Sequence, residues 1–118
     1  MVKILIMDEK TFHEQNMKDI EEGKIQKEDL VMCFDSLSTL RKVLTDKRVN
    51  LLRFVKNRKP RSLYELSKLV GKDLKNVQVD AHLLEQFGLI TLEKTTEGGR
   101  TRVRPTTRIK KLDVSIPL

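Results

Sequence analysis

The sequence is short of the residue types that several protein classes require. It has no tryptophan, one tyrosine and four phenylalanines, so its core must be built mostly from Leu, Val and Ile. Cys33 is the only cysteine, which excludes an internal disulfide and fits a reducing cytoplasm. No apolar run is long enough to span a bilayer, and we expect no membrane partner. Residues 1–8 are too few and turn acidic too soon for a signal peptide.

Residues that could bind a metal or carry catalysis are also scarce. Cys33, His13 and His82 lack the spacing of metal ligands, so we expect no metal site and no cofactor. The serines stand at helix starts or on polar faces, and the carboxylates do not pair. Gly98 and Gly99 have a turn explanation and are too few for a phosphate loop. The sequence therefore predicts that the protein is not an enzyme.

The charge is unevenly distributed along the chain. The net charge of +7 divides into −4 for residues 1–40 and +11 for residues 41–118. The basic part suits a phosphate backbone, although a solvated basic surface is the plainer explanation. The acidic part is expected to do something other than touch nucleic acid. At 118 residues, the chain is one domain or a small domain with an appendage.

The segment 62–88 has the pattern of two short helices joined by a turn. Ser62 opens a capping box, in which its hydroxyl bonds the amide three residues on. Gly71 stands where a helix end needs left-handed backbone. Asp73 is expected to cap the second helix with its side chain, and Gly88 to end it. Such helix pairs commonly place one helix in the DNA major groove.

Five elements are expected before this segment. They are a strand at residues 2–7, a helix from Asp8 to about Glu22, a strand at 30–34, a helix from Asp35 or Ser36 carrying Leu37, Leu40 and Leu44 on one face, and a helix from Thr45 to about Arg58. Lys59 precedes Pro60, so we expect it to be extended. The wide apolar face of the helix at 45–58 places that helix in the core.

Strands are expected after residue 88. Two β-rich arms, at 89–94 and 101–104, flank the turn signal at 96–99 and predict a hairpin. The segment 109–118 alternates strictly between apolar and polar residues, which predicts a strand with one buried face. Pro117 indicates that this strand lies at an edge or end.

The order helix, helix, helix, hairpin over residues 45–106 resembles a winged helix-turn-helix domain. The sequence VQVDAHLLEQFGLI at 77–90 looks like the end of a recognition helix entering the wing in the MarR and ArsR superfamilies of prokaryotic regulators. The segments FDSL at 34–37 and LRKVLTDKR at 40–48 are similar to a narrower, largely archaeal group of small MarR-like DNA-binding proteins. The resemblance implies transcriptional regulation.

We therefore expect an α+β fold built around a winged helix-turn-helix. Residues 36–106 would form this DNA-binding domain, with a three-helix core and a β-hairpin wing. Residues 1–35 would form a strand–helix–strand extension for dimerisation or partner binding, and residues 107–118 a C-terminal strand.

A helical wheel of the segment 74–87 separates two faces. The inward face is expected to carry Leu74, Val77, Ala81 and Leu84, and the outward face Lys75, Gln78, Val79 and His82. The outward residues suit base edges, since Lys pairs with guanine, Gln with adenine, and Val contacts the thymine methyl. The alternative is an exposed helix face with no partner.

Three residues lie on the flank between these faces: Asn76, Asp80 and Leu83. We count Asn76 among the candidate DNA contacts. Asp80 would repel phosphate, and we expect it to orient Lys75 or Lys72, or to cap locally.

The hairpin supplies further candidates. Alternation places Arg100, Arg102 and Arg104 on one side, where they could enter a minor groove. The alternative is an edge strand protected by charge. Arg61 and the backbone at Ser62 are expected phosphate anchors.

We expect a sequence-specific, double-stranded DNA-binding regulator that acts as a dimeric repressor. The helix at 74–87 would read the major groove, and the hairpin at 91–104 the minor groove or backbone. A homodimer is expected because one such domain contacts few phosphates. Two alternatives stay open. One is an antitoxin-type protein-binding module that grips its partner through residues 1–40 and represses its own operon. The other is an architectural DNA-binding protein without sequence preference.

Overall fold

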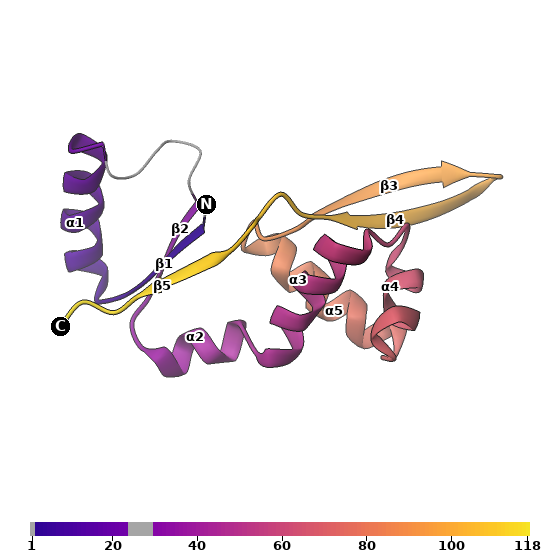
Figure 1. Cartoon of the computed structure of the whole chain (residues 1–118), viewed down its shortest axis with the longest axis horizontal. Coiled ribbons are helices and arrows are strands. Elements are labelled where there is room, and N and C mark those ends of the chain that lie inside the picture. The colour runs from indigo at the N-terminus through magenta and orange to yellow at the C-terminus, as the bar shows by residue number, and fades with distance from the viewer. Residues whose placement is uncertain (1, 24–29) are drawn as a thin grey trace. The chain divides into compact units, whose positions relative to one another are not determined.

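The computed structural model describes residues 2–23 and 30–118, which fold into two compact units (Figure 1). The sheet unit comprises residues 1–43 and 109–118, and the helix–hairpin unit comprises residues 44–108. Both units contain helices and strands, so the expected α+β class is confirmed. The division differs from the expected domains, because residues 36–43 belong with the sheet. Their helix contacts a strand of that sheet and buries Leu40.

The sheet unit is organised around three parallel strands. They are β1 (Val2–Ile6), β2 (Leu30–Phe34) and β5 (Leu112–Ser115), in the order β2-β1-β5. Val2 and Ile4 of the central strand are buried, and so are Met32 and Phe34 beside them. These residues alternate along their strands and so share one face, as the period of a strand requires.

β5 corrects the expectation of a long strand with one buried face. The strand ends at Ser115, and Val114 and Ile116 are 49% and 47% exposed. The reason is that β5 is an edge strand, with a neighbour on the β1 side only among the described residues. The edge position itself agrees with the presence of Pro117.

Two helices complete the sheet unit. α1 (Glu9–Glu21) begins after Asp8, whose carboxylate accepts a hydrogen bond from the Thr11 amide at 2.7 Å, and Gly23 follows it at φ 72°. This bond lowers the pKa of Asp8. α2 (Leu37–Val43) begins after Ser36, whose hydroxyl accepts from the Thr39 amide. Both helices begin where a side-chain cap predicts.

The helix–hairpin unit contains α3 (Asp46–Arg58), α4 (Leu63–Val70), α5 (Leu74–Gln86), β3 (Thr91–Glu97) and β4 (Arg100–Thr106). The Ser62 hydroxyl accepts a hydrogen bond from the Glu65 amide at 3.0 Å, which confirms the cap of α4. Gly71 and Gly88 are left-handed at φ 67° and 76°, which confirms both helix ends. Asp73 is the N-cap residue of α5, but its side chain makes no capping bond, so that expectation is wrong. None of the helices in the described ranges is long and apolar enough to cross a membrane.

Lys59 corrects the sequence-based expectation of an extended residue. Its backbone is left-handed, at φ 47° and ψ 59°. The chain must turn from α3 into α4 within a few residues while it buries Pro60. A left-handed residue at a helix end makes that turn, and the residue before a proline is kept out of the right-handed helical region.

The three helices share one core, from which the hairpin extends (Figure 1). The buried apolar residues of the helices are Leu51, Leu52, Val55, Leu63, Leu66, Val77, Ala81 and Leu84. Two hydrogen bonds attach the hairpin base. Glu85 accepts one from the Leu92 amide at 3.3 Å, and the Thr107 hydroxyl donates to the Leu89 carbonyl at 2.8 Å. The hairpin is therefore held to the end of α5.

Candidate nucleic-acid interface

The outward side of α5 gathers the four residues that the helical wheel selected. Lys75, Gln78, Val79 and His82 line one shallow depression, and we call these four residues the reading face. All four side chains are exposed, and Val79 is 59% exposed. Of the four predicted inward residues, Val77, Ala81 and Leu84 are buried, whereas Leu74 is partly exposed and lines a second depression. The predicted division of the helix into two faces is therefore confirmed except at Leu74.

A second depression lies between α4, α5 and the hairpin. It is lined by Ser62, Leu63, Tyr64, Glu65, Lys68, Leu74, Gln78, Arg100, Thr101, Arg102 and Val103. Gln78 lines both depressions, so the two adjoin at that side chain. Residues from three separate parts of the sequence thus form one continuous surface. Its charged members are mostly basic, with Glu65 as the single acid in the two linings.

The hairpin register distinguishes its three arginines. Arg100, Arg102 and Arg104 stand opposite Glu97, Thr95 and Glu93 respectively, so the three share one side, as predicted. Arg100 and Arg104 each have a glutamate as their direct partner across the ladder, and the same two glutamates lie diagonally from Arg102. Arg102 faces a threonine. It is the hairpin arginine that lines the second depression without a carboxylate directly opposite it.

Several predicted residues lie apart from the two depressions. Asn76, Arg61 and Arg104 are exposed, but they line neither depression. Ser62 lines the second depression, yet its side chain is buried and its hydroxyl is occupied by the cap of α4. The hydroxyl serves the cap as an acceptor, so at Ser62 an anion could meet the backbone amide or the hydroxyl hydrogen.

Sequence reasoning missed three residues of this surface. The Lys68 ammonium lies 5.2 Å from the centroid of the Tyr64 ring, and Tyr64 is 59% exposed. Their spacing of four residues on one helix was a usable signal. Arg48 of α3 lines the same depression as the reading face. No local pattern could have indicated Arg48, because α3 and α5 meet only in the tertiary structure.

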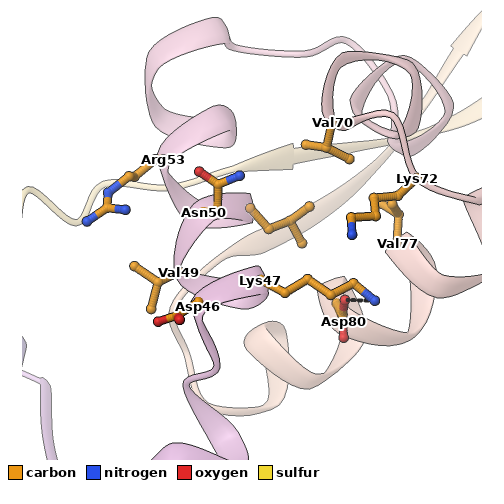
Figure 2. A pocket seen from close by; sticks show the side chains of 10 residues that line it. Asp46, Lys47, Val49, Asn50, Arg53, Val70, Lys72, Val77 and Asp80 are labelled. Carbon is orange, nitrogen blue, oxygen red and sulfur yellow. Dashed lines mark ion pairs between the residues drawn. The ribbon is translucent and has the colours of Figure 1, made fainter.

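Asp80 does not serve the roles expected of it. Its carboxylate is buried and accepts a hydrogen bond from Arg48 Nε at 3.1 Å, while Lys47 Nζ lies 3.3 Å from its other oxygen (Figure 2). The Lys47 contact is an ion pair without hydrogen-bond geometry. Asp80 therefore ties α5 to α3, and does not orient Lys75 or Lys72 or cap the helix. Its place three residues after Val77 turns it inward.

The sheet unit holds the lone cysteine and a histidine close together. Cys33 and His13 line a small pocket with Met7, Glu9, Phe12 and Asp35. The Cys33 thiol donates to the Met7 carbonyl at 3.3 Å, and burial raises its pKa. No cluster of three His, Cys, Asp or Glu side chains that could hold a metal occurs in the described part of the chain.

Comparison with known proteins gives a match to a protein family. A family model described as HVO_A0114 matches residues 43–114, which is more than half of the chain and includes the whole helix–hairpin unit. No curated protein and no solved structure matches the chain.

Proposed function

The chain belongs to the HVO_A0114 family, and we propose that it is a sequence-specific regulator that binds double-stranded DNA through its helix–hairpin unit. In this proposal, α3, α4 and α5 with the β3–β4 hairpin are a winged helix-turn-helix. The predicted kinship with MarR- and ArsR-like regulators is part of the same proposal.

One observation carries the proposal. The reading face and the hairpin arginines adjoin through Gln78, although they come from separate parts of the sequence. A helix can enter the major groove only if its outward residues suit base edges and nearby cations suit phosphate. The surface combines both kinds of residue, and it does so within a unit whose part of the chain is strongly basic.

Val79 argues for base contact beyond simple charge attraction. Val79 is 59% exposed on a polar helix face, so it contributes nothing to the core. A thymine methyl is an apolar feature of the major groove that such a side chain can contact. In this arrangement Lys75 and Gln78 would form hydrogen bonds to base edges beside it.

The second depression suits the sugar–phosphate backbone and the adjacent groove. Arg61 precedes α4 and is exposed, whereas Lys68 lies in the last turn of that helix. The first amides of a helix offer donors that suit a phosphate group. Arg102 extends the basic surface onto the hairpin, where it could enter the minor groove or contact phosphate. A repressor role would follow from occupancy of a promoter.

Binding-site selection from random duplexes tests the proposal directly. We expect one enriched sequence, with affinity for it well above that for a random duplex at the same salt concentration. Equal affinity for both duplexes would overturn the proposal and favour an architectural DNA-binding protein without sequence preference. A salt titration on each duplex separates the two contributions, because phosphate contacts set the salt slope and base contacts set the sequence ratio.

A protein-binding role has one observation in its favour. Met17, Ile20 and Leu37 of the sheet unit are apolar and each about half exposed or more. They lie in the acidic part of the chain, which suits a protein partner better than DNA. This keeps the antitoxin-type alternative open, and co-purification with the product of a neighbouring gene would test it.

A further inference from the structure

The outer edge of β5 is an open sheet edge. Across residues 2–23 and 30–118, β5 pairs with β1 alone. The opposite edge strand, β2, is contacted by both α1 and α2. An unpaired strand edge exposes a row of amide and carbonyl groups that can pair with another strand. β5 is therefore an edge of this sheet that is available for pairing.

The apolar face of the sheet is incomplete at this same edge. Ile4 of β1 and Val114 of β5 are direct register partners, so their side chains share one face. Ile4 is 0% exposed, whereas Val114 is 49% exposed and Ile116 beyond it is 47% exposed. The apolar side chains of this face are thus buried on the central strand but half exposed on the edge strand. A further strand beside β5 would continue this face and cover Val114.

We propose that this strand is β5 of a second copy of the chain, paired antiparallel across a two-fold axis. The two three-stranded sheets would then join into one sheet of six strands. Such a contact is self-complementary, since the same patch serves on both copies. The proposed contact does not involve DNA, so it can be tested independently of the proposed function.

The sequence of β5 selects one register for this contact. In an antiparallel pair, two residues that face each other directly have their side chains on the same side of the sheet. A two-fold axis normal to the sheet leaves each side chain on its own side. The axis must therefore pass between a residue and the same residue of the second copy. With Val114 on the axis, Leu112 faces the second copy's Ile116, and Asp113 faces the second copy's Ser115. The exposed apolar residues then face apolar residues, and no like charges meet.

The two neighbouring registers are less favourable. An axis at Asp113 would place that carboxylate opposite its own copy, and like charges directly across a ladder are destabilising. An axis at Ser115 would bring Pro117, which has no amide hydrogen, into the ladder opposite Asp113. The self-complementarity of the Val114 register is what identifies a second copy as the occupant.

Measuring the mass of the full chain in solution tests the contact without DNA. Light scattering over a wide concentration range should show a dimer, and Val114→Lys should raise its dissociation constant at least tenfold. The control is Ile20→Lys, which places the same charge at an α1 position that is also 49% exposed. It should leave the dimer intact. A monomer at every concentration, or loss of the dimer with Ile20→Lys and not with Val114→Lys, would overturn the proposal.

Cross-linking tests the register and does not depend on how well the lysine variant folds. In a Cys33→Ser background, Val114→Cys should form a disulfide-linked dimer on oxidation, because facing Cα atoms lie about 4.5–5.5 Å apart. Asp113→Cys should not link to itself, since its own copy would lie on the diagonal, beyond disulfide reach. Linkage through Asp113→Cys in preference to Val114→Cys contradicts the proposed register. A dimer without DNA binding would leave this inference standing while the proposed function fails.

Discussion

Arg48 of α3 donates a hydrogen bond from Nε to the buried carboxylate of Asp80 on α5, over a distance of 3.1 Å. The bond joins residues that are 32 positions apart. Arg48 also lines the depression that this face forms. The same ion pair thus sets how α5 sits against α3 and keeps a cation at the edge of the candidate interface.

Removing the Asp80 carboxylate should destabilise the helix–hairpin unit. Asp80→Ala leaves Arg48 without this acceptor and Lys47 without its counter-ion, and we expect a loss of about 1–3 kcal/mol in the free energy of unfolding. The lower half of that range is favoured because the Lys47 side chain is 42% exposed. Urea denaturation of both proteins measures the difference.

A double-mutant cycle separates this bond from general damage to the core. If Asp80 acts through Arg48, then Asp80→Ala costs less in an Arg48→Ala background, with a coupling energy of about 1 kcal/mol. Simple additivity of the two losses would mean that the bond contributes no stability.

Truncating the reading face should lower sequence preference more than general affinity. Gln78→Ala and Val79→Ala should each reduce the preference for the selected duplex by about 1–3 kcal/mol per lost base contact, with little change on random DNA. Fluorescence anisotropy on both duplexes measures this. Asn57→Ala, at an exposed position on α3 outside both depressions, is the control. Equal weakening on both duplexes would argue against base readout.

Arg102 should contribute to binding through its charge. Because Arg102 lines the second depression and has Thr95 as its direct partner across the hairpin, Arg102→Ala should reduce the slope of log affinity against log salt by about one unit. Arg53→Ala removes an exposed arginine of α3 that lines a different pocket, so it is the matched control. An unchanged slope for Arg102→Ala would show that the hairpin does not contact phosphate.

Lys59 offers a stabilising substitution. Its φ of 47° is a left-handed conformation that is about 1 kcal/mol less favourable for a residue with a Cβ atom than for glycine. Lys59→Gly should therefore raise the free energy of unfolding by a few tenths to about 1 kcal/mol. Lys56→Gly, in the right-handed last turn of α3, should instead lower the free energy of unfolding by up to about 1 kcal/mol. Thermal unfolding that moves both variants in the same direction contradicts the left-handed geometry at Lys59.

The Cys33 thiol should react slowly in the folded protein. Burial raises its pKa, so at a given alkaline pH less of it is thiolate than in the unfolded chain. Alkylation at about pH 8.5 should therefore be slower before denaturation than after it. The raised pKa of the Cys33 thiol also contributes to stability. This contribution is fully present at pH values below the thiol's pKa in the unfolded chain, and it is lost as the pH rises through the thiol's pKa in the folded protein. Cys33→Ser should remove that part of the alkaline loss.

Local chemistry was sufficient for much of the fold. The caps at Asp8 and Ser62 and the left-handed glycines at 71 and 88 depend on residues within four positions, so the sequence predicted them well. The division of α5 into two faces followed from its period alone. The relation of the reading face to the hairpin was only partly accessible, since an order of elements does not say which side chains adjoin.

The sequence by itself determined which segments become helices and strands, and which residues of α5 point outward, because short-range hydrogen bonds and periodicity decide both. Only the tertiary structure decided that Asp80 pairs with Arg48, that Lys59 adopts a left-handed backbone, and that Val114 remains exposed. Each of these depends on which distant segment lies alongside. A buried carboxylate needs a cation from another helix, a turn must meet the next element, and an edge strand lacks a neighbour that the sequence could not place.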